Sequence, residues 1–389
     1  MRLVLLSGSG PSELSSRLES LRAGEHPPEP SSPEQGALRA AIVAADREEL
    51  SAKAESIEGW LSEGESDRLR VGRGIALAVA RERPRLGFLF PGQGAPVTTH
   101  GGYLEELLPG AAAIYRQASW LSDGEVPASL VQLSVVTASL AGLRALAELG
   151  VDADLGVGHS VGELTALHWA GAINEDDVLE LARRRGEIMT EHATEQGAMA
   201  NIEAEDATFA RIVDGGDVTV ACFNSPLNRV ISGTEGAIEA VVQRARGQDG
   251  ARALKLPVVG AFHSPLMNEA APVFERVLSE QAFGALQRPV FSTISGGRIA
   301  AGDDVAELLS RQVTEPVLFL NAVRAADDGA DLLIEVGPGR MLSGLVSEFS
   351  SVPSVALRVG HSSAQGLLSA VGAAWALGAD VNVDLLPDA

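Results

Sequence analysis

The sequence predicts an α/β protein whose main sheet is parallel, and three observations point to it. From residue 85 onward, short apolar runs alternate with longer segments of helical periodicity, which is typical of a parallel sheet flanked by helices. Inside this alternation, residues 197–256 follow the order β-α-β-β-α-β of the ferredoxin-like motif. The chain of 389 residues also exceeds the usual size of one simple core. We therefore expect a large α/β subdomain interrupted by a small ferredoxin-like one, with a cleft between them.

The first 85 residues are expected to form a small α/β linker domain. It has an apolar run at 3–6, a polar, Pro-rich stretch at 25–33, a strand at 40–45 and a helix at 46–61. The other expected domains are the large subdomain at 86–196 and 257–345, the small subdomain at 197–256, and a C-terminal linker segment at 346–389.

The periodicity of the remaining chain predicts each element of the two subdomains. In the large subdomain we expect strands at 86–90, 155–159, near 289–294 and 331–336, and helices at 103–119, 129–149, 161–170, 175–192, 265–281, 303–311 and 317–327. In the small subdomain we expect strands at 198–204, 217–223, 228–232 and 251–256, and helices at 206–213 and 234–247.

Composition excludes several classes of function. The 52 acidic and 30 basic residues give a formal charge of −22, which disfavours nucleic-acid binding because phosphate contacts need a positive field. No uninterrupted apolar run reaches the roughly 18 residues of a membrane span, and the N-terminal run is too short for a secretory signal. We expect a soluble, cytoplasmic protein. A single cysteine, Cys222, and seven histidines without metal-ligand spacing predict no disulfide and no metal.

The strongest local motif is Gly158-His159-Ser160-Val161-Gly162, which lies between a predicted strand and a predicted helix. In this context GxSxG is typical of a nucleophile elbow, whose small flanking residues permit a sharp turn that exposes the serine hydroxyl. The following helix N-terminus faces incoming negative charge. The segment VGHS recurs at 359–362, but no glycine follows at the required position. We therefore predict that Ser160 is a nucleophile.

A nucleophilic serine needs a base, and His263 is the candidate. It lies in the segment Gly260-Ala261-Phe262-His263-Ser264, where the inserted subdomain returns to the large one. Its competitors are His100, His159, His168, His192 and His361.

Arg185 is the third candidate, because it lies on the apolar face of its helix, four residues after Leu181 and three before Ile188. A buried guanidinium requires an anion, and its planar fork suits a carboxylate. From this feature alone, the carboxylate can belong to the protein or to a substrate.

Five ordered motifs resemble the malonyl-type acyltransferases of fatty-acid and polyketide synthesis. They are Pro91-Gly92-Gln93-Gly94 after the first strand of the large subdomain, GHSVGE at 158–163, an arginine 25 residues after the serine, AFHSP at 261–265, and EVGPG at 335–339. The match covers roughly residues 86–345. The flanking segments resemble the linkers around such a domain in a type I, iterative, bacterial polyketide synthase, so we expect an excised domain.

This resemblance implies a fold, a reaction and a set of site residues. The large subdomain would be α/β-hydrolase-like, and the reaction would be ping-pong transfer of malonyl from coenzyme A to the phosphopantetheine of an acyl carrier protein. No cofactor would be permanently bound, and a ketosynthase would adjoin the N-terminal linker. The implied site is Ser160 and His263 as a catalytic dyad, the backbone carbonyl of Gln312 orienting the imidazole, Arg185 on the malonyl carboxylate, the N–H groups of Gln93 and Val161 as the oxyanion hole, and Asn224 beside them.

Substrate selectivity and two alternative functions complete the expectations. Gly260 stands where malonyl-selective members often carry His and methylmalonyl-selective ones Tyr, whereas Phe262 and Val161 favour malonyl, since Phe262 would crowd an α-methyl group. One methyl group is worth about 1–3 kcal/mol. One alternative is an α/β-hydrolase such as a thioesterase, which would need an acidic triad member and leaves Arg185 unexplained. The other is a non-catalytic scaffold that binds the carrier protein, which would need none of these residues.

Overall fold

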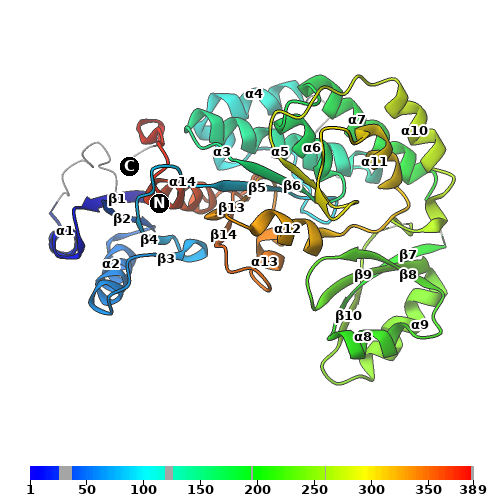
Figure 1. Cartoon of the computed structure of the whole chain (residues 1–389), viewed down its shortest axis with the longest axis horizontal. Helices are drawn as coiled ribbons and strands as arrows, with labels where there is room; N and C mark the ends of the chain where they lie inside the picture. The colour runs from blue at the N-terminus through cyan, green and yellow to red at the C-terminus, as the bar shows by residue number, and fades with distance from the viewer. Residues whose placement is uncertain (26–36, 119–125, 194–195, 259, 387–389) are drawn as a thin grey trace.

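The apolar runs of the chain form three separate sheets (Figure 1). The computed structural model describes residues 1–25, 37–118, 126–193, 196–258 and 260–386. The expected Pro-rich stretch at 25–33 lies outside these residues except for Glu25.

The N-terminal sheet belongs to the linker domain and is antiparallel, with the order β1-β2-β4-β3. Its elements are β1 (Arg2–Gly8), α1 (Pro11–Ala23), β2 (Leu38–Ala44), α2 (Arg47–Ser62), β3 (Arg68–Arg70) and β4 (Ile75–Val79). Alternate residues of β1 and β2 enter two different cores, one under α1 and α2 and one shared with the large subdomain. Both faces of this sheet are therefore buried, which explains why its strands are continuously apolar.

The second core contains a helix from the other end of the chain. Helix α14 (Gln365–Leu377) packs against β2 and β4. Arg39 of β2 is 2% exposed and donates a 2.7 Å hydrogen bond to the carbonyl oxygen of Trp375. Its guanidinium also lies 4.9 Å from the centre of the Trp375 ring. The expected C-terminal linker segment thus closes the N-terminal linker domain.

The large subdomain is built on a six-stranded sheet with the order β12-β11-β6-β5-β13-β14, parallel except for β12. Its strands are β5 (Leu86–Phe90), β6 (Leu155–Gly158), β11 (Val290–Ser292), β12 (Gly297–Arg298), β13 (Leu332–Glu335) and β14 (Ser354–Ala356). Helices cover both faces (Figure 1). They are α3 (Tyr103–Leu107), α4 (Pro109–Gln117), α5 (Val131–Glu148), α6 (Gly162–Trp169), α7 (Glu175–Glu191), α10 (Ala271–Ser279), α11 (Val305–Arg311), α12 (Phe319–Asp327) and α13 (Met341–Val346).

Two predicted helices are interrupted in the structure. The expected helix at 103–119 ends at Leu107, because Leu108 is extended and Pro109 begins α4. A proline is favoured at the start of a helix and cannot continue one. The expected helix at 265–281 begins as a 3₁₀ turn at Pro265–Met267, and α10 follows only from Ala271.

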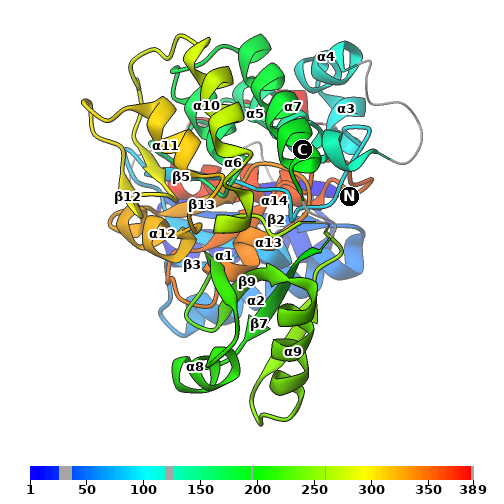
Figure 2. The ribbon, with the colours of Figure 1, turned by 90° about the vertical axis from the view of Figure 1, so that its right-hand side faces the viewer.

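The inserted small subdomain has the predicted ferredoxin-like order of elements. It comprises β7 (Gly197–Glu203), α8 (Asp206–Val213), β8 (Val218–Phe223), β9 (Asn228–Thr234), α9 (Glu235–Arg246) and β10 (Arg252–Lys255), and its antiparallel sheet has the order β10-β7-β9-β8. Figures 1 and 2 show α8 and α9 on the side of this sheet that faces away from the large subdomain. The other face of the sheet is thus turned towards the large subdomain.

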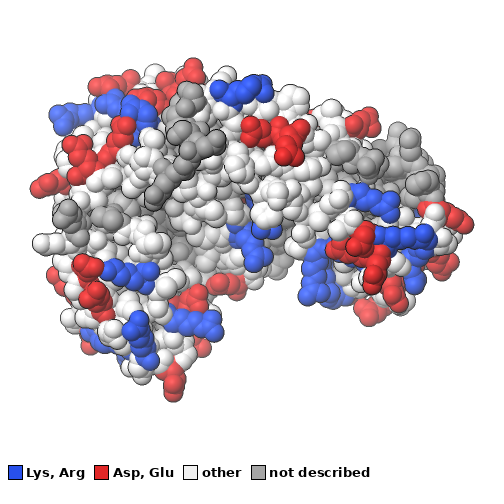
Figure 3. Space-filling model, turned by 180° about the vertical axis from the view of Figure 1, so that it is seen from behind, with Lys and Arg blue, Asp and Glu red and all other residues white. Residues whose placement is uncertain are grey.

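One helical stretch, Ala128–Glu148, is long and apolar enough to cross a membrane, but 72% of its apolar window is buried inside the protein. It contains α5, a core helix of the large subdomain. On the surface, acidic and basic side chains lie side by side at both ends of the face shown in Figure 3.

Candidate active site

Ser160 lies in a strained turn between β6 and α6, as the GxSxG motif predicts. Its φ is +52°, a left-handed backbone conformation that residues other than glycine rarely adopt. Both flanking glycines are required by close packing. A Cβ on Gly158 would lie 2.4 Å from the backbone nitrogen of Glu163, and one on Gly162 would lie 2.1 Å from the carbonyl oxygen of Phe90. The turn is thus locked against β5.

His263 meets the serine from the segment that follows the small subdomain. Its Nε2 lies 2.9 Å from the Ser160 Oγ, and its Nδ1 lies 3.2 Å from the carbonyl oxygen of Glu315. A carbonyl can only accept, so Nδ1 carries the proton and Nε2 can accept the serine proton. Burial, and then the charge of Arg185, lower the pKa of His263 to about 3. The imidazole is therefore neutral, as a general base requires.

Two backbone carbonyls act on the imidazole, that of Gln312, which the resemblance implied, and that of Glu315. The hydrogen bond to His263 Nδ1 goes to Glu315, although the Gln312 backbone also raises the pKa of this imidazole. Gln312 acts mainly through its side chain, whose Nε2 donates to the Ser160 carbonyl oxygen at 3.0 Å and to Glu163 Oε2 at 3.0 Å. Gln312 follows the last residue of α11. Its side chain therefore contacts the serine backbone, while the carbonyl of Glu315, three residues later, contacts the histidine.

Arg185 is 1% exposed and lies on α7 beside the serine. Its guanidinium donates to Gln132 Oε1 at 2.6 Å and to Ser160 Oγ at 3.4 Å, and Nε has no partner. Among the described residues it forms no ion pair. Burial lowers its pKa to about 10, while the nearby charge of Glu163 acts in the opposite direction. The sequence left open whether the carboxylate that pairs with Arg185 belongs to the protein or to a substrate. In the described part of the chain, no protein carboxylate contacts the guanidinium.

Gln132 and Glu163 are buried polar residues that sequence reasoning missed. Gln132 Nε2 donates to Gln93 Oε1 at 2.9 Å and thereby ties Arg185 to the PGQG loop. Its only sequence signal was a single amide in a mainly apolar helix. Glu163 is 2% exposed and belongs to the GHSVGE motif, but nothing in that motif shows which partners its carboxylate contacts.

The two N–H groups expected to form the oxyanion hole are available. Within the described ranges, neither Gln93 nor Val161 donates its backbone N–H to another group. The PGQG loop packs directly on the turn, since a Cβ on Gly92 would lie 2.6 Å from the His159 carbonyl oxygen. The two donors are therefore held at the same turn.

Asn224 lies beside the site, and it binds the histidine that precedes the serine. Its Oδ1 lies 2.9 Å from His159 Nε2, and its Nδ2 donates to Asn228 at 3.1 Å. The His159 ring also lies 5.4 Å from that of Phe319. His159 thus supports the turn from the side, and burial lowers its pKa.

The comparisons with known proteins decide the family. Acyl transferase domains match residues 123–357, which is more than half of the chain. This chain belongs to the acyl transferase domain family. It is 34% identical over 285 residues to the malonyl CoA-acyl carrier protein transacylase of Bacillus subtilis, covering 68% of this chain and 90% of that protein. It is also 34% identical over 330 residues to the polyketide synthase GfsB of Streptomyces halstedii, which covers 79% of this chain but only 6% of GfsB.

Solved structures agree with this family. The acyltransferase domain of an iterative polyketide synthase in enediyne biosynthesis superposes with a TM-score of 0.82 at 34% identity, covering 97% of this chain and 96% of that one. The transacylase from Clostridium perfringens gives a TM-score of 0.65 at 32% identity, covering 71% and 93%. The resemblance stated from the motifs is confirmed, and neither the thioesterase nor the scaffold alternative gains support.

A cavity of about 320 Å³ opens between the two subdomains of this acyl transferase and reaches Ser160 and His263. Its walls are mainly apolar and come from the large subdomain, the small sheet and the segment that follows β10. They include Gln93, Gly94, His159, Met189, Met199, Asn201, Cys222, Asn224, Asn228, Val230, Leu254, Leu256, Val258, Phe262, Met341 and Leu345. Arg185 does not line this cavity, although its guanidinium lies 3.4 Å from the Ser160 Oγ.

Of the three residues expected to govern selectivity, Phe262 alone lines the cavity. The side chain of Val161 is fully buried in the core. Gly260 has a φ of +109°, and a Cβ there would lie 2.8 Å from that of Ala193 and 3.2 Å from the Phe262 ring. A side chain at 260 would therefore act on the cavity through Phe262.

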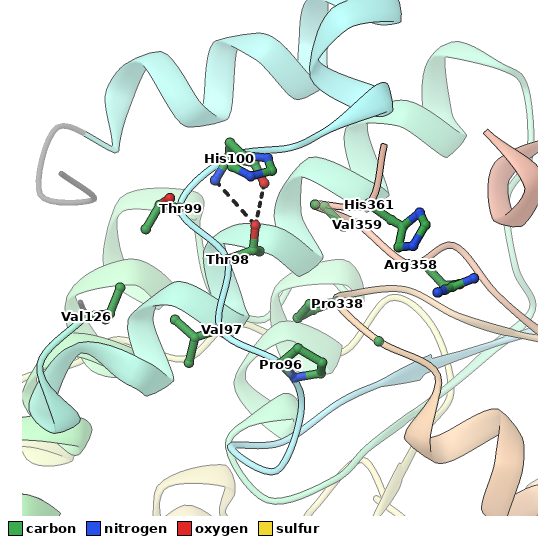
Figure 4. Close-up of a pocket in the computed structure, with 12 residues that line it drawn as sticks. Pro96, Val97, Thr98, Thr99, His100, Val126, Pro338, Arg358, Val359 and His361 are labelled. Atoms are coloured by element: carbon green, nitrogen blue, oxygen red, sulfur yellow. Dashed lines mark hydrogen bonds between the residues drawn. The ribbon is translucent and has the colours of Figure 1, made fainter. Parts of the chain in front are cut away.

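A second hollow of about 510 Å³ lies outside this site (Figure 4). It is bounded by residues 96–100 after β5 and by 358–361 after β14. His100 and His361 line this hollow and not the cavity at Ser160, so neither of these two competitors for the role of base shares the serine's cavity. His168 is bonded to the Ile173 carbonyl instead.

Proposed function

We propose that this acyl transferase moves a malonyl group from malonyl-CoA to the phosphopantetheine thiol of an acyl carrier protein through a malonyl-serine intermediate. The observation that carries this proposal is Arg185, a buried guanidinium that contacts no carboxylate among the described residues and lies 3.4 Å from the Ser160 Oγ. An isolated buried charge is costly, so its retention beside a nucleophile indicates an anionic group on the substrate. The name of the Bacillus subtilis relative supports malonyl as that substrate.

The first half-reaction starts from the 2.9 Å contact between Ser160 and His263. His263 Nε2 takes the hydroxyl proton as Oγ attacks the thioester carbonyl, and the N–H groups of Gln93 and Val161 stabilise the oxyanion. The C–S bond then breaks, and the imidazolium returns its proton to the coenzyme A thiolate. The malonyl carboxylate, only three carbons from Oγ, pairs with Arg185 and fixes the acyl group.

The second half-reaction reverses these steps with another thiol. The carrier thiol gives its proton to His263 and attacks the malonyl-serine carbonyl, and Ser160 leaves as the alcohol after regaining a proton from the imidazolium. The cavity between the subdomains is the path for the pantetheine arm, since it joins Ser160 to the surface at Leu254, which is 66% exposed.

The wider setting belongs to the same proposal. We place the chain in polyketide biosynthesis, in the cytoplasm, with a ketosynthase beside the N-terminal linker domain. We keep the expected boundaries 1–85, 86–196 and 197–256, but extend the large subdomain from 257–345 through β14, because β14 pairs with β13 in its sheet; the expected segment 346–389 is thus shortened at its start. No resident cofactor or metal is needed for the reaction. Phe262, in the cavity wall, should favour malonyl over methylmalonyl by roughly 10- to 200-fold, the effect of one methyl group in a fitted pocket.

Intact-protein mass spectrometry tests this function. The wild-type chain is mixed separately with malonyl-CoA, methylmalonyl-CoA and acetyl-CoA. The Ser160→Ala variant is treated in the same way. A malonyl adduct that is absent from the variant and is discharged by a carrier protein is the expected result. Free coenzyme A without an adduct would instead indicate hydrolysis, and neither product would indicate a scaffold.

A further inference from the structure

Glu163 is a buried carboxylate three residues after the proposed nucleophile, and the reaction described above does not use it. It accepts hydrogen bonds on both oxygens. Oε1 receives the Ser292 hydroxyl at 3.0 Å, the Thr293 hydroxyl at 2.9 Å and the Thr293 backbone N–H. Oε2 receives the Gln312 Nε2 at 3.0 Å. Burial is the main influence on this group, and it raises the pKa of Glu163 to about 6.

The partners of Glu163 come from separate parts of the fold. Ser292 and Thr293 lie at the carboxyl end of β11, the strand beside β6. Gln312 caps α11. Glu163 itself lies in the first turn of α6, three residues after the serine, and its own backbone N–H donates to the Ser160 carbonyl at 2.9 Å. One carboxylate therefore joins the serine turn to a neighbouring strand and to the end of a helix.

Gln312 carries this connection to the backbone of Ser160 and to the segment that orients His263. The same Nε2 that binds Glu163 also holds the Ser160 carbonyl at 3.0 Å. Three residues later, the Glu315 carbonyl binds His263 Nδ1 at 3.2 Å. Ser160 needs such restraint, because a non-glycine residue at φ +52° costs about 1–3 kcal/mol and persists only where its surroundings impose it.

We propose that Glu163 is a positioning residue for this acyl transferase: through Gln312 it holds the backbone of Ser160 and the segment that orients His263. The carboxylate that contacts the imidazole in a serine triad is thus replaced by one that acts on the backbone around the pair. The proposal rests on the proposed function in that it takes Ser160 as the nucleophile.

Glu163→Gln is the variant that isolates this role. An amide has one acceptor oxygen, and the Ser292 and Thr293 donors already require it. Its NH₂ would then face the Gln312 NH₂, so two donors would oppose each other. Gln312 must turn away and release the Ser160 carbonyl. The volume of the side chain hardly changes, so packing is preserved.

The first measurement is the rate at which a fluorophosphonate labels Ser160, because this probe needs the nucleophile, the base and the oxyanion hole but has no carboxylate for Arg185. We expect Glu163→Gln to slow labelling roughly 10- to 100-fold, the size of effect that small misplacements produce. Labelling within about twofold of the wild type would overturn the proposal. If the wild type is not labelled at Ser160 at all, the proposed function fails instead.

A control and a double-mutant cycle separate positioning from stability. Glu335→Gln changes another buried carboxylate at a strand end, which accepts from Leu342 and Ser343 in α13. Both variants should lower Tm, but only Glu163→Gln should slow labelling strongly. Gln312→Ala should slow it to a similar extent, and the double variant should be no slower than either. Equal slowing in Glu335→Gln, or additive effects at 163 and 312, would contradict the proposal.

Steady-state kinetics supply a readout that a purely structural role would not change. The charge of Glu163 raises the pKa of the Arg185 guanidinium, although no ion pair joins the two described side chains. Removing that negative charge leaves Arg185 free to attract the malonyl carboxylate. We therefore expect Glu163→Gln to lower kcat while KM for malonyl-CoA falls or stays the same. A raised KM with unchanged kcat would place Glu163 in substrate binding and exclude the positioning role.

Discussion

Ser160 and His263, 103 residues apart in the chain, both have positive φ values, +52° and +56°, and their side chains meet at 2.9 Å. Among the described residues other than glycine, only Arg358 shares this conformation. Backbone strain in this acyl transferase is therefore concentrated where two side chains must converge. The hydrogen bond that Gln312 donates to the Ser160 carbonyl and the one that the Glu315 carbonyl accepts from His263 hold both residues in place.

This strain predicts an unusual order of stability at position 160. Ser160→Ala keeps a side chain at positive φ, whereas Ser160→Gly removes the conformational cost. We expect the glycine variant to be more stable than the alanine variant by about 1 kcal/mol, the reverse of the usual order in regular structure. Thermal denaturation of the two variants measures the difference. Neither should form an acyl-enzyme, and an alanine variant as stable as the glycine one would show that Ser160 is not strained.

Arg185→Ala should remove the preference for a dicarboxylic acyl group. Truncating one partner of a buried charge pair costs about 2–5 kcal/mol, so kcat/KM for malonyl-CoA should fall roughly 30-fold or more, while acetyl transfer is relatively favoured. The matched control is Arg184→Ala on the same helix, an arginine paired at the surface with Glu280. It should leave both activities nearly unchanged. Unchanged malonyl loading in Arg185→Ala would refute the assignment.

The pH dependence of Ser160 labelling should also respond to Arg185. Burial first, and then the Arg185 charge, lower the pKa of His263 from 6.5 to about 3. The acid limb of the wild-type profile should therefore lie well below pH 6.5. Arg185→Ala removes a positive charge and admits water, and both effects raise the pKa of His263, so the limb should move to higher pH. A limb that does not move, or moves to lower pH, would contradict this electrostatic coupling.

Gly162→Ala should be severely destabilising, because its Cβ would lie 2.1 Å from the Phe90 carbonyl oxygen, a backbone atom that cannot move alone. We expect a loss of several kcal/mol or failure to fold. Gly236 is the control: it also lies in the first turn of a helix, α9, and a Cβ there meets nothing within 4 Å. Gly236→Ala should stabilise the protein by about 0.4–1 kcal/mol. Denaturant unfolding of both variants tests the pair.

The order of strands and helices from residue 85 onward could be predicted from the sequence because each element carries its own periodicity. Helix 103–119 was predicted too long, since its apolar pattern continues across Pro109 while the backbone cannot. Strand β3 has only three residues, and α14 is apolar on every side, so neither has a periodicity that reveals its place. The packing of α14 on the linker sheet depends on contacts between residues more than 300 positions apart in the chain, which no local pattern shows.

Some residues of the candidate site could likewise be predicted from local sequence, and others could not. Ser160 could be predicted because its turn requires glycines at fixed positions, and Arg185 because a charge on an apolar helix face needs a partner. His263 was chosen from its position in the chain and from the resemblance. Glu163 and Gln132 were missed, because each acquires its role from partners on other elements. The Glu315 carbonyl was missed for the same reason, since it reaches His263 only because the chain turns after α11 ends at Arg311.

The contact between α14 and the linker sheet predicts that the linker domain and the large subdomain unfold together. Trp375 is 7% exposed, and its helix shares one apolar core with residues of both. Trp375→Ala should reduce the free energy of unfolding by about 3–5 kcal/mol, typical for removing a buried aromatic side chain. It should lower the midpoint temperature of a single unfolding transition. Calorimetry of the wild type and the variant measures this. Two separate transitions, with only one shifted by the variant, would show instead that α14 does not couple the two parts.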